Sequence, residues 1–191
     1  MYIILEGIDG TGKTTQTKLL TEDLKEKGYN ATQVIEPTNS EIGKLIRKYL
    51  QDKDSTTSNK QDILALLFAA DRLTLKNTLK KVKGNKKEII ISDRSYYSSL
   101  AYQNNDIWVK DLNKKAVKPD IIIILDMPVK EALTRCMKQD TFETQEFLIQ
   151  TKENYLNIAK KENIPIVKAN QSIEKVQNDI KKIVYEKINE L

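Results

Sequence analysis

The strongest constraint on the fold lies in the first sixteen residues, MYIILEGIDGTGKTTQ. A short apolar run at residues 3–5 leads into GIDGTGKT at residues 7–14, which matches the pattern G-x-x-x-x-G-K-[ST]. Glycines in such a turn let the backbone wrap a phosphate chain with its N–H groups pointing inward. A strand is expected before the pattern and a helix after it, as the pattern requires. The segment is therefore predicted to bind a nucleoside triphosphate. A glycine-rich turn without a ligand is the alternative, and the fit of both spacing and context disfavours it.

Two side chains of this loop are expected to act on the triphosphate directly. Lys13 is predicted to reach the β- and γ-phosphates, and the Thr14 hydroxyl to ligate Mg²⁺, at the positive end of the following helix. The residues predicted to bind ATP are Gly7, Asp9, Gly10, Thr11, Gly12, Lys13, Thr14 and Thr15.

Composition narrows the class of protein. The 191 residues suit one well-buried domain, so we expect residues 1–191 to form a single domain. One cysteine, Cys136, and no apolar run near the ~20 residues of a membrane span predict a cytoplasmic protein with no membrane partner. The net charge is +5, but the lysines stand beside Glu and Asp along amphipathic helices, so we expect no nucleic-acid partner. The chain has no histidine, which excludes a histidine base.

Strand-like and helix-like patterns alternate along the chain. Continuous β-branched runs, such as residues 121–124, suit strands buried on both faces of a parallel sheet. We therefore predict a three-layer α/β fold, with helices flanking a five-stranded parallel sheet and ligands at the carboxyl ends of its strands. The predicted strands are 2–6, 31–35, 87–92, 120–126 and 163–168, and the predicted helices are 13–27, 41–50, 60–82 and four more after Ser95, Pro128, Thr144 and Ser172.

Polar residues follow the third predicted strand. Asp93 can orient a magnesium-bound water, and Arg94 can clamp a phosphate with its planar fork. Alternatively, the two side chains pair with each other. Asp126 ends the next predicted strand and is a rival magnesium partner; Asp93 is preferred because an arginine adjoins it.

Another pair of residues predicts a nucleobase pocket. Phe68 and Arg72 are spaced i,i+4 and share one face of a predicted helix. The ring can stack on a base while the guanidinium donates to the base edge. Alternatively, Phe68 is an ordinary core residue. Further hydroxyl and amide contacts can come from Ser98, Ser99, Tyr102 and Gln103.

Together these segments resemble the thymidylate kinase family of P-loop nucleoside-monophosphate kinases, which have the P-loop NTPase fold. The matching segments occur in family order over nearly the whole chain and are LEGIDGTGKTTQ, EPTNSEIGKLIRKYL, LLFAADR, SDRSYYSSLAYQ, KPDIIIILD and QSIEKV. The resemblance implies transfer of the γ-phosphoryl group of ATP to dTMP, with Mg²⁺ as cofactor, by a homodimer.

The resemblance also implies roles for individual residues. Phe68 would stack on thymine, Arg94 would hold the acceptor phosphate, and Asp9 would lie near the acceptor sugar. The residues implied to bind dTMP are Asp9, Phe68, Arg72, Arg94, Ser98, Ser99, Tyr102 and Gln103. The implied catalytic residues are Lys13, Asp93, Arg94 and Arg135, with Thr14 and Asp93 at the metal. A lid at about residues 135–144 would close over ATP, and residues 170–171 would pass close to adenine.

Three positions depart from the family pattern. Ile35 and Thr141 stand where arginine is common, and Ser95 where an aromatic residue or histidine is common. The phosphate loop also has no basic residue between its glycines, so the lid cation is expected to be Arg135, helped by Lys138.

Two alternative functions stay open at the level of sequence. One is a kinase for another monophosphate or for a deoxynucleoside, with Glu36 as the base that a neutral hydroxyl needs. The other is a P-loop binding protein that has lost phosphoryl transfer.

Overall fold

The computed structural model of the chain describes residues 1–52, 55–83, 85, 87–103, 106–136 and 144–190. A parallel sheet lies at its centre, with strand order β2-β3-β1-β4-β5. The strands are β1 (Tyr2–Glu6), β2 (Asn30–Ile35), β3 (Glu88–Asp93), β4 (Ile121–Asp126) and β5 (Ile166–Lys168). The predicted α/β fold with a five-stranded parallel sheet is confirmed over the described residues.

The helices of the described ranges follow the predicted alternation with two differences. They are α1 (Lys13–Glu26), α2 (Glu41–Leu50), α3 (Ser58–Thr74), α4 (Lys76–Val82), α5 (Tyr96–Tyr102), α6 (Asp106–Asn113), α7 (Val129–Arg135), α8 (Gln145–Glu162) and α9 (Ile173–Asn189). No helix within these ranges is both long and apolar enough to cross a lipid bilayer. Helix α6 was not predicted.

The single helix predicted over residues 60–82 is wrong, because the chain forms α3 and α4 there. Leu75 lies between them, and its N–H donates to the Arg72 carbonyl at 3.1 Å, a tight i→i−3 bond. The Thr74 hydroxyl donates to the Asp71 carbonyl at 2.6 Å, so a side chain competes for a helical acceptor at the end of α3. The strand predicted over 163–168 is also shorter, since Asn163 takes a left-handed conformation (φ 56°) that ends α8.

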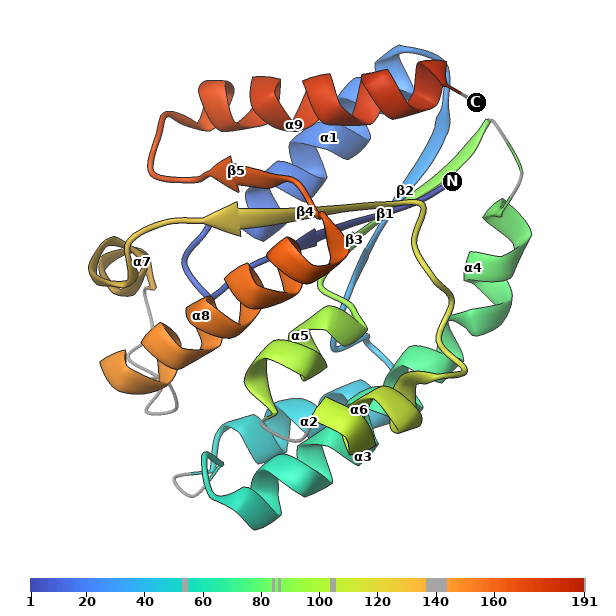
Figure 1. The fold of residues 1–191 in the computed structure, drawn as a ribbon. Coiled ribbons are helices and arrows are strands. Elements are labelled where there is room, and N and C mark those ends of the chain that lie inside the picture. The colour runs from blue at the N-terminus through green and yellow to red at the C-terminus, as the bar shows by residue number, and fades with distance from the viewer. Residues whose placement is uncertain (53–54, 84, 86, 104–105, 137–143, 191) are drawn as a thin grey trace.

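Helices cover both faces of the sheet. Helices α1 and α9 lie along one face, and α5 and α8 lie along the other (Figure 1). Helix α3 packs against α2, α5 and α6. These four helices lie next to the carboxyl ends of β2 and β3, where a ligand cavity can form.

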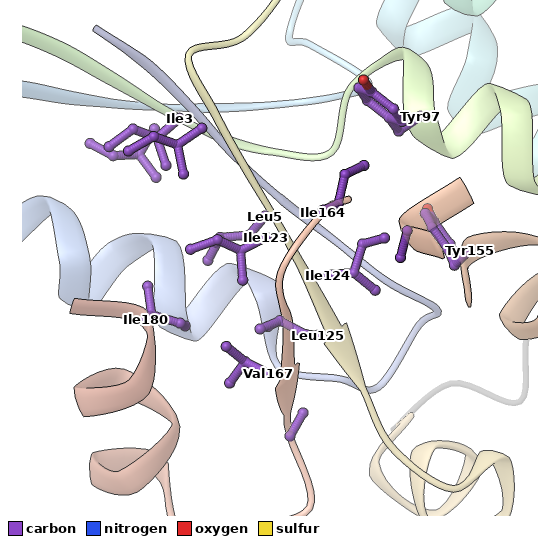
Figure 2. Packing of buried hydrophobic residues seen from close by; sticks show 14 of the residues in the cluster. Ile3, Leu5, Tyr97, Ile123, Ile124, Leu125, Tyr155, Ile164, Val167 and Ile180 are labelled. Atoms are coloured by element: carbon purple, nitrogen blue, oxygen red, sulfur yellow. The ribbon is translucent and has the colours of Figure 1, made fainter. Parts of the chain in front are cut away.

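Two apolar clusters pack against the sheet, and the larger one involves most of its strands. Leu5 of β1, Ile123 of β4 and Val167 of β5 are buried in one cluster with Ile180 of α9 (Figure 2). Tyr155 of α8 belongs to the same cluster and points its hydroxyl toward the carboxyl end of β1. Strands buried on both faces hold their ends rigidly, which positions the polar residues that follow them.

Candidate active site

The phosphate loop joins β1 to α1 and is shaped by glycines. Gly10 has φ +82°, and a Cβ atom there would lie 2.2 Å from the Ala132 carbonyl oxygen of α7. At Gly7 (φ +141°) a Cβ atom would lie 2.4 Å from the Leu125 carbonyl oxygen. Both positions therefore need glycine for the close approach as well as for the backbone angle.

Two side chains of the phosphate loop form hydrogen bonds with the loop's own backbone. The Lys13 ammonium and the Thr11 hydroxyl both donate to the Ile8 carbonyl, each at 2.8 Å. Lys13 Nζ lies 3.6 Å from Asp9 Oδ1. Burial, with Arg94 nearby, lowers the pKa of Lys13 below its ordinary value. Lys13 is thus a buried cation held at the N-terminus of α1.

Thr14 and Asp93 meet where β3 ends. The Thr14 hydroxyl donates to Asp93 Oδ2 at 2.5 Å. Hydroxyl and carboxylate oxygens are ligands that suit Mg²⁺, which keeps most of its remaining positions for water and phosphate. The two residues predicted to hold the metal therefore fit that ion. Asp126, the rival, forms an ion pair with Lys152 at 2.8 Å and lines neither cavity described below.

A wide cavity of about 750 Å³ opens over the loop, and we call it the donor cavity. Seven of the eight residues predicted to bind ATP line it; Gly7 does not. Arg135 and Gln171 also line it, and Arg135 Nη1 donates to the Ala169 carbonyl at 3.1 Å. The rest of the predicted lid, including Lys138 and Thr141, lies outside the described residues.

Arg94 stands between the donor cavity and a second one. Its backbone takes a left-handed conformation (φ 75°), and its guanidinium pairs with Asp9. Nη1 donates to Ser98 Oγ at 2.9 Å, to the Gly7 carbonyl at 3.2 Å and to Tyr155 OH at 3.4 Å. Burial alone would lower the pKa of Arg94, but Tyr102 and Asp9 outweigh it and raise the pKa. Asp93 and Arg94 thus engage different partners, so the alternative in which they only pair with each other is wrong.

The second cavity, of about 210 Å³, lies between the carboxyl end of β2 and helices α3 and α5; we call it the acceptor cavity. All eight residues predicted to bind dTMP line it. Phe68 is half-buried there, and so it is not an ordinary core residue. The acceptor and donor cavities share three lining residues, Asp9, Glu36 and Arg94.

A buried ion pair forms one wall of the acceptor cavity. Arg72 Nη2 lies 2.7 Å from Glu36 Oε2, and the two side chains are 3% and 2% exposed. Arg72 also donates to Asn113 Oδ1 of α6 and, at 3.5 Å, to Ser99 Oγ. Burial raises the pKa of Glu36 to about 7, against the opposing charge of Arg72. The guanidinium is fixed on three sides, and its remaining N–H groups are donors only.

The loop before α2 is tied to the same helix that carries Arg72. Asp71 accepts from the Thr38 N–H at 2.7 Å and from the Thr38 and Ser40 hydroxyls, each at 2.6 Å. Arg47 donates to the Thr38 and Pro37 carbonyls at 2.8 and 2.6 Å. These bonds hold Pro37 and Glu36 against the acceptor cavity.

Three residues that bond to the site residues were not predicted from the sequence. Glu6, Tyr155 and Asn113 each bond to a predicted site residue or to its partner. Glu6 carried a signal, because it is a charged residue at the end of an otherwise apolar strand; Tyr155 and Asn113 carried none. Of the departures from the family pattern, Ile35 is 43% exposed at the donor cavity, and Ser95 donates to Glu6 at 2.8 Å.

Fold and site together define the class. A glycine-rich phosphate loop between a parallel strand and a helix, with two adjoining cavities that share an arginine, is the architecture of a P-loop kinase for a small acceptor.

Comparisons with known proteins identify the family. A family model described as thymidylate kinase matches residues 5–180. A probable thymidylate kinase of Methanosphaera stadtmanae is 50% identical over 186 residues, 95% of each chain. One from Methanothermobacter thermautotrophicus is 44% identical, over 96% of this chain and 94% of the relative. A solved thymidylate kinase of Candida albicans superposes with a TM-score of 0.79 at 28% identity, over 97% of this chain and 91% of that one. The chain belongs to the thymidylate kinase family.

Proposed function

We propose that this chain transfers the γ-phosphoryl group of ATP to the phosphate of dTMP, giving dTDP and ADP. The observation that carries the proposal is that the donor and acceptor cavities adjoin at Asp9, Glu36 and Arg94. A donor phosphate over the loop and an acceptor phosphate at Arg94 can then approach each other without rearrangement of the sheet.

On the donor side, the loop binds the triphosphate. The backbone N–H groups around Gly10 and Gly12 point at the phosphates, and Lys13 neutralises charge on the β- and γ-oxygens. Thr14 and Asp93 would hold Mg²⁺, which would screen the phosphate charge. Arg135, which lines the donor cavity, supplies a further cation to the transferring group.

On the acceptor side, side chains select the ligand. Phe68 stacks on the thymine ring, and Arg72 donates to a base carbonyl. Arg94 grips the phosphate, while Asp9 lies at the sugar. Ser98, Ser99, Tyr102 and Gln103 complete the wall. No general base is needed, because a phosphate monoester is ionised near neutral pH.

The buried pair of Glu36 and Arg72 favours this reaction over nucleoside phosphorylation. A nucleoside hydroxyl would need a carboxylate base; Glu36 Oε2 is engaged by Arg72 at 2.7 Å, which weakens the carboxylate as a base, while Oε1 accepts no hydrogen bond from the described residues. Glu36 is better explained as the anchor that orients Arg72.

The test is ADP release with ATP and Mg²⁺ across a panel of acceptors: dTMP, dUMP, dCMP, dGMP and thymidine. We expect dTMP to give the highest kcat/KM and thymidine to give no turnover. ATP hydrolysis without an acceptor should be slow, because closure over both ligands excludes water. Turnover with thymidine, or ATP binding without dTDP formation, would support one of the two alternative functions instead.

Three further expectations belong to this proposal. The chain acts as one kinase domain over residues 1–191, with a lid at about residues 135–144. It works as a homodimer in the cytoplasm, on ATP and dTMP and without nucleic acid. Sedimentation at several concentrations tests the dimer.

A further inference from the structure

The Glu6 carboxylate lines neither cavity but bonds to residues that also contact Arg94. Glu6, the last residue of β1, is 0% exposed. Its oxygens accept from Ser98 Oγ at 2.7 Å, Ser95 Oγ at 2.8 Å, Tyr155 OH at 2.9 Å and the Ser98 N–H at 3.3 Å. Four donors converge on Glu6, so the carboxylate acts here only as an acceptor.

Two of these donors also contact Arg94. Ser98 Oγ and Tyr155 OH lie 2.9 Å from each other and both reach Glu6 Oε2. Each hydroxyl has one proton. Whether Tyr155 donates to Glu6 directly or through Ser98, both protons run toward the carboxylate.

The lone pairs of the two hydroxyls are then left for Arg94. Its Nη1 donates to Ser98 Oγ at 2.9 Å and to Tyr155 OH at 3.4 Å. Burial and the nearby Glu6 raise the pKa of Tyr155, so the phenol keeps the proton that it donates. A guanidinium has no acceptor, so it can be held on this side only by oxygens whose protons point elsewhere.

We propose that Glu6 is a positioning residue for the phosphate-binding arginine: through Ser98 and Tyr155 it fixes the direction of two hydroxyl protons and thereby the orientation of the Arg94 fork. The inference rests on the proposed function, in which Arg94 binds the acceptor phosphate. It assigns a role in phosphate recognition to two residues, Glu6 and Tyr155, that do not line the site.

An amide of the same size breaks this arrangement. Glu6→Gln replaces one acceptor oxygen by an NH₂ donor, so a hydroxyl must turn its proton toward Arg94 or lose a partner. The guanidinium then loses its support while the apolar core keeps its volume. Tyr155→Phe removes one of the two hydroxyls and leaves Ser98, so its effect is smaller.

The experiment measures the dissociation constants of dTMP and of thymidine by calorimetry, and the readout is their ratio. In the wild type dTMP binds more tightly, because its phosphate meets Arg94. We expect Glu6→Gln to reduce this preference about tenfold and Tyr155→Phe about threefold, with thymidine affinity unchanged. Arg94→Lys defines the largest loss of this preference, since an ammonium cannot reproduce the planar, bidentate geometry of the guanidinium.

Asp71→Asn is the matched control. Asp71 is also a buried carboxylate that accepts from hydroxyls and an N–H, but it contacts Thr38 and Ser40 rather than the support of Arg94. We expect any effect of this variant to weaken dTMP and thymidine equally and to leave the ratio unchanged.

Two results would overturn the inference: an unchanged ratio in both Glu6→Gln and Tyr155→Phe, or additive losses when Glu6→Gln is combined with Arg94→Lys. If Glu6→Gln does not fold, Tyr155→Phe and its combination with Arg94→Lys decide the question alone. A wild type that binds thymidine as tightly as dTMP would contradict the proposed function instead, because Arg94 would then not read the phosphate.

Discussion

The two cavities meet at Arg94 but are built in opposite ways. The donor cavity is shaped by the backbone of one continuous loop, in which Gly7 and Gly10 approach Leu125 and Ala132 too closely for any side chain. The acceptor cavity is smaller, about 210 Å³ against about 750 Å³, and is enclosed mainly by side chains from α3, α5 and the residues that follow β2. A loop of backbone donors fits any triphosphate, whereas a wall of fixed side chains fits one base. Under the proposed function, general binding of the donor and selective binding of the acceptor would therefore have separate structural origins.

The largest expected effect is on the donor side. Lys13→Met removes the buried cation from the phosphate loop, and we expect turnover to fall about 10³-fold, about 4 kcal/mol of transition-state stabilisation. ADP release at saturating dTMP measures it. Lys18→Met, an exposed position on the same helix, is the control and should retain activity. Normal turnover of the Lys13 variant would place the catalytic charge elsewhere.

On the acceptor side, the next largest effect is on stability. Arg72→Met leaves the Glu36 carboxylate buried without its cation, so we expect the free energy of unfolding to fall by about 3–4 kcal/mol. Urea unfolding measures it. The double variant Glu36→Gln with Arg72→Met should recover part of the loss, because no unpaired charge is left. A single-variant loss below about 1 kcal/mol would mean that the pair does not hold this wall together.

A smaller effect is expected at Arg135, which lines the donor cavity. Arg135→Ala should lower turnover about 10²-fold and leave dTMP affinity unchanged, because its cation acts on the transferring group alone. Steady-state kinetics together with dTMP calorimetry separate the two quantities. Lys130→Ala, an exposed basic position on the same helix, is the control. Equal losses in turnover and in dTMP affinity would contradict a role confined to the donor side.

The smallest effect concerns the far end of α1. Burial alone would raise the pKa of Asp23, but Lys181 and Tyr185 of α9 outweigh it and lower the pKa below 3.8. The stability from this group is therefore fully present above its ordinary pKa and is lost as pH falls through the lowered one. Asp23→Asn should cost about 1 kcal/mol near pH 7 and progressively less below about pH 4. Urea unfolding between pH 3 and 7 checks this, and a constant difference would contradict it.

Local patterns predicted the parts of the site that lie close together in the chain. The phosphate loop, Asp93-Arg94 and the pair of Phe68 and Arg72 all follow from short spacings, and the structure brings each to a cavity. The break between α3 and α4 was missed because helical periodicity continues through Leu75, whereas the Leu75 N–H bonds to the Arg72 carbonyl in an i→i−3 pattern. Helix α6 was missed, and with it Asn113, which holds Arg72 from 41 residues away.

The sequence by itself determined the parallel α/β architecture, the nucleotide loop and the family, because these depend on runs and spacings within a few residues. Only the tertiary structure decided what surrounds Arg72 and Arg94. Tyr155 meets Glu6 across 149 residues, and Arg72 meets Glu36 across 36. No local pattern encodes such contacts, since they exist only once β1, β2, α3, α5 and α8 are packed. The direction of a hydroxyl proton or a guanidinium fork is fixed by that packing alone.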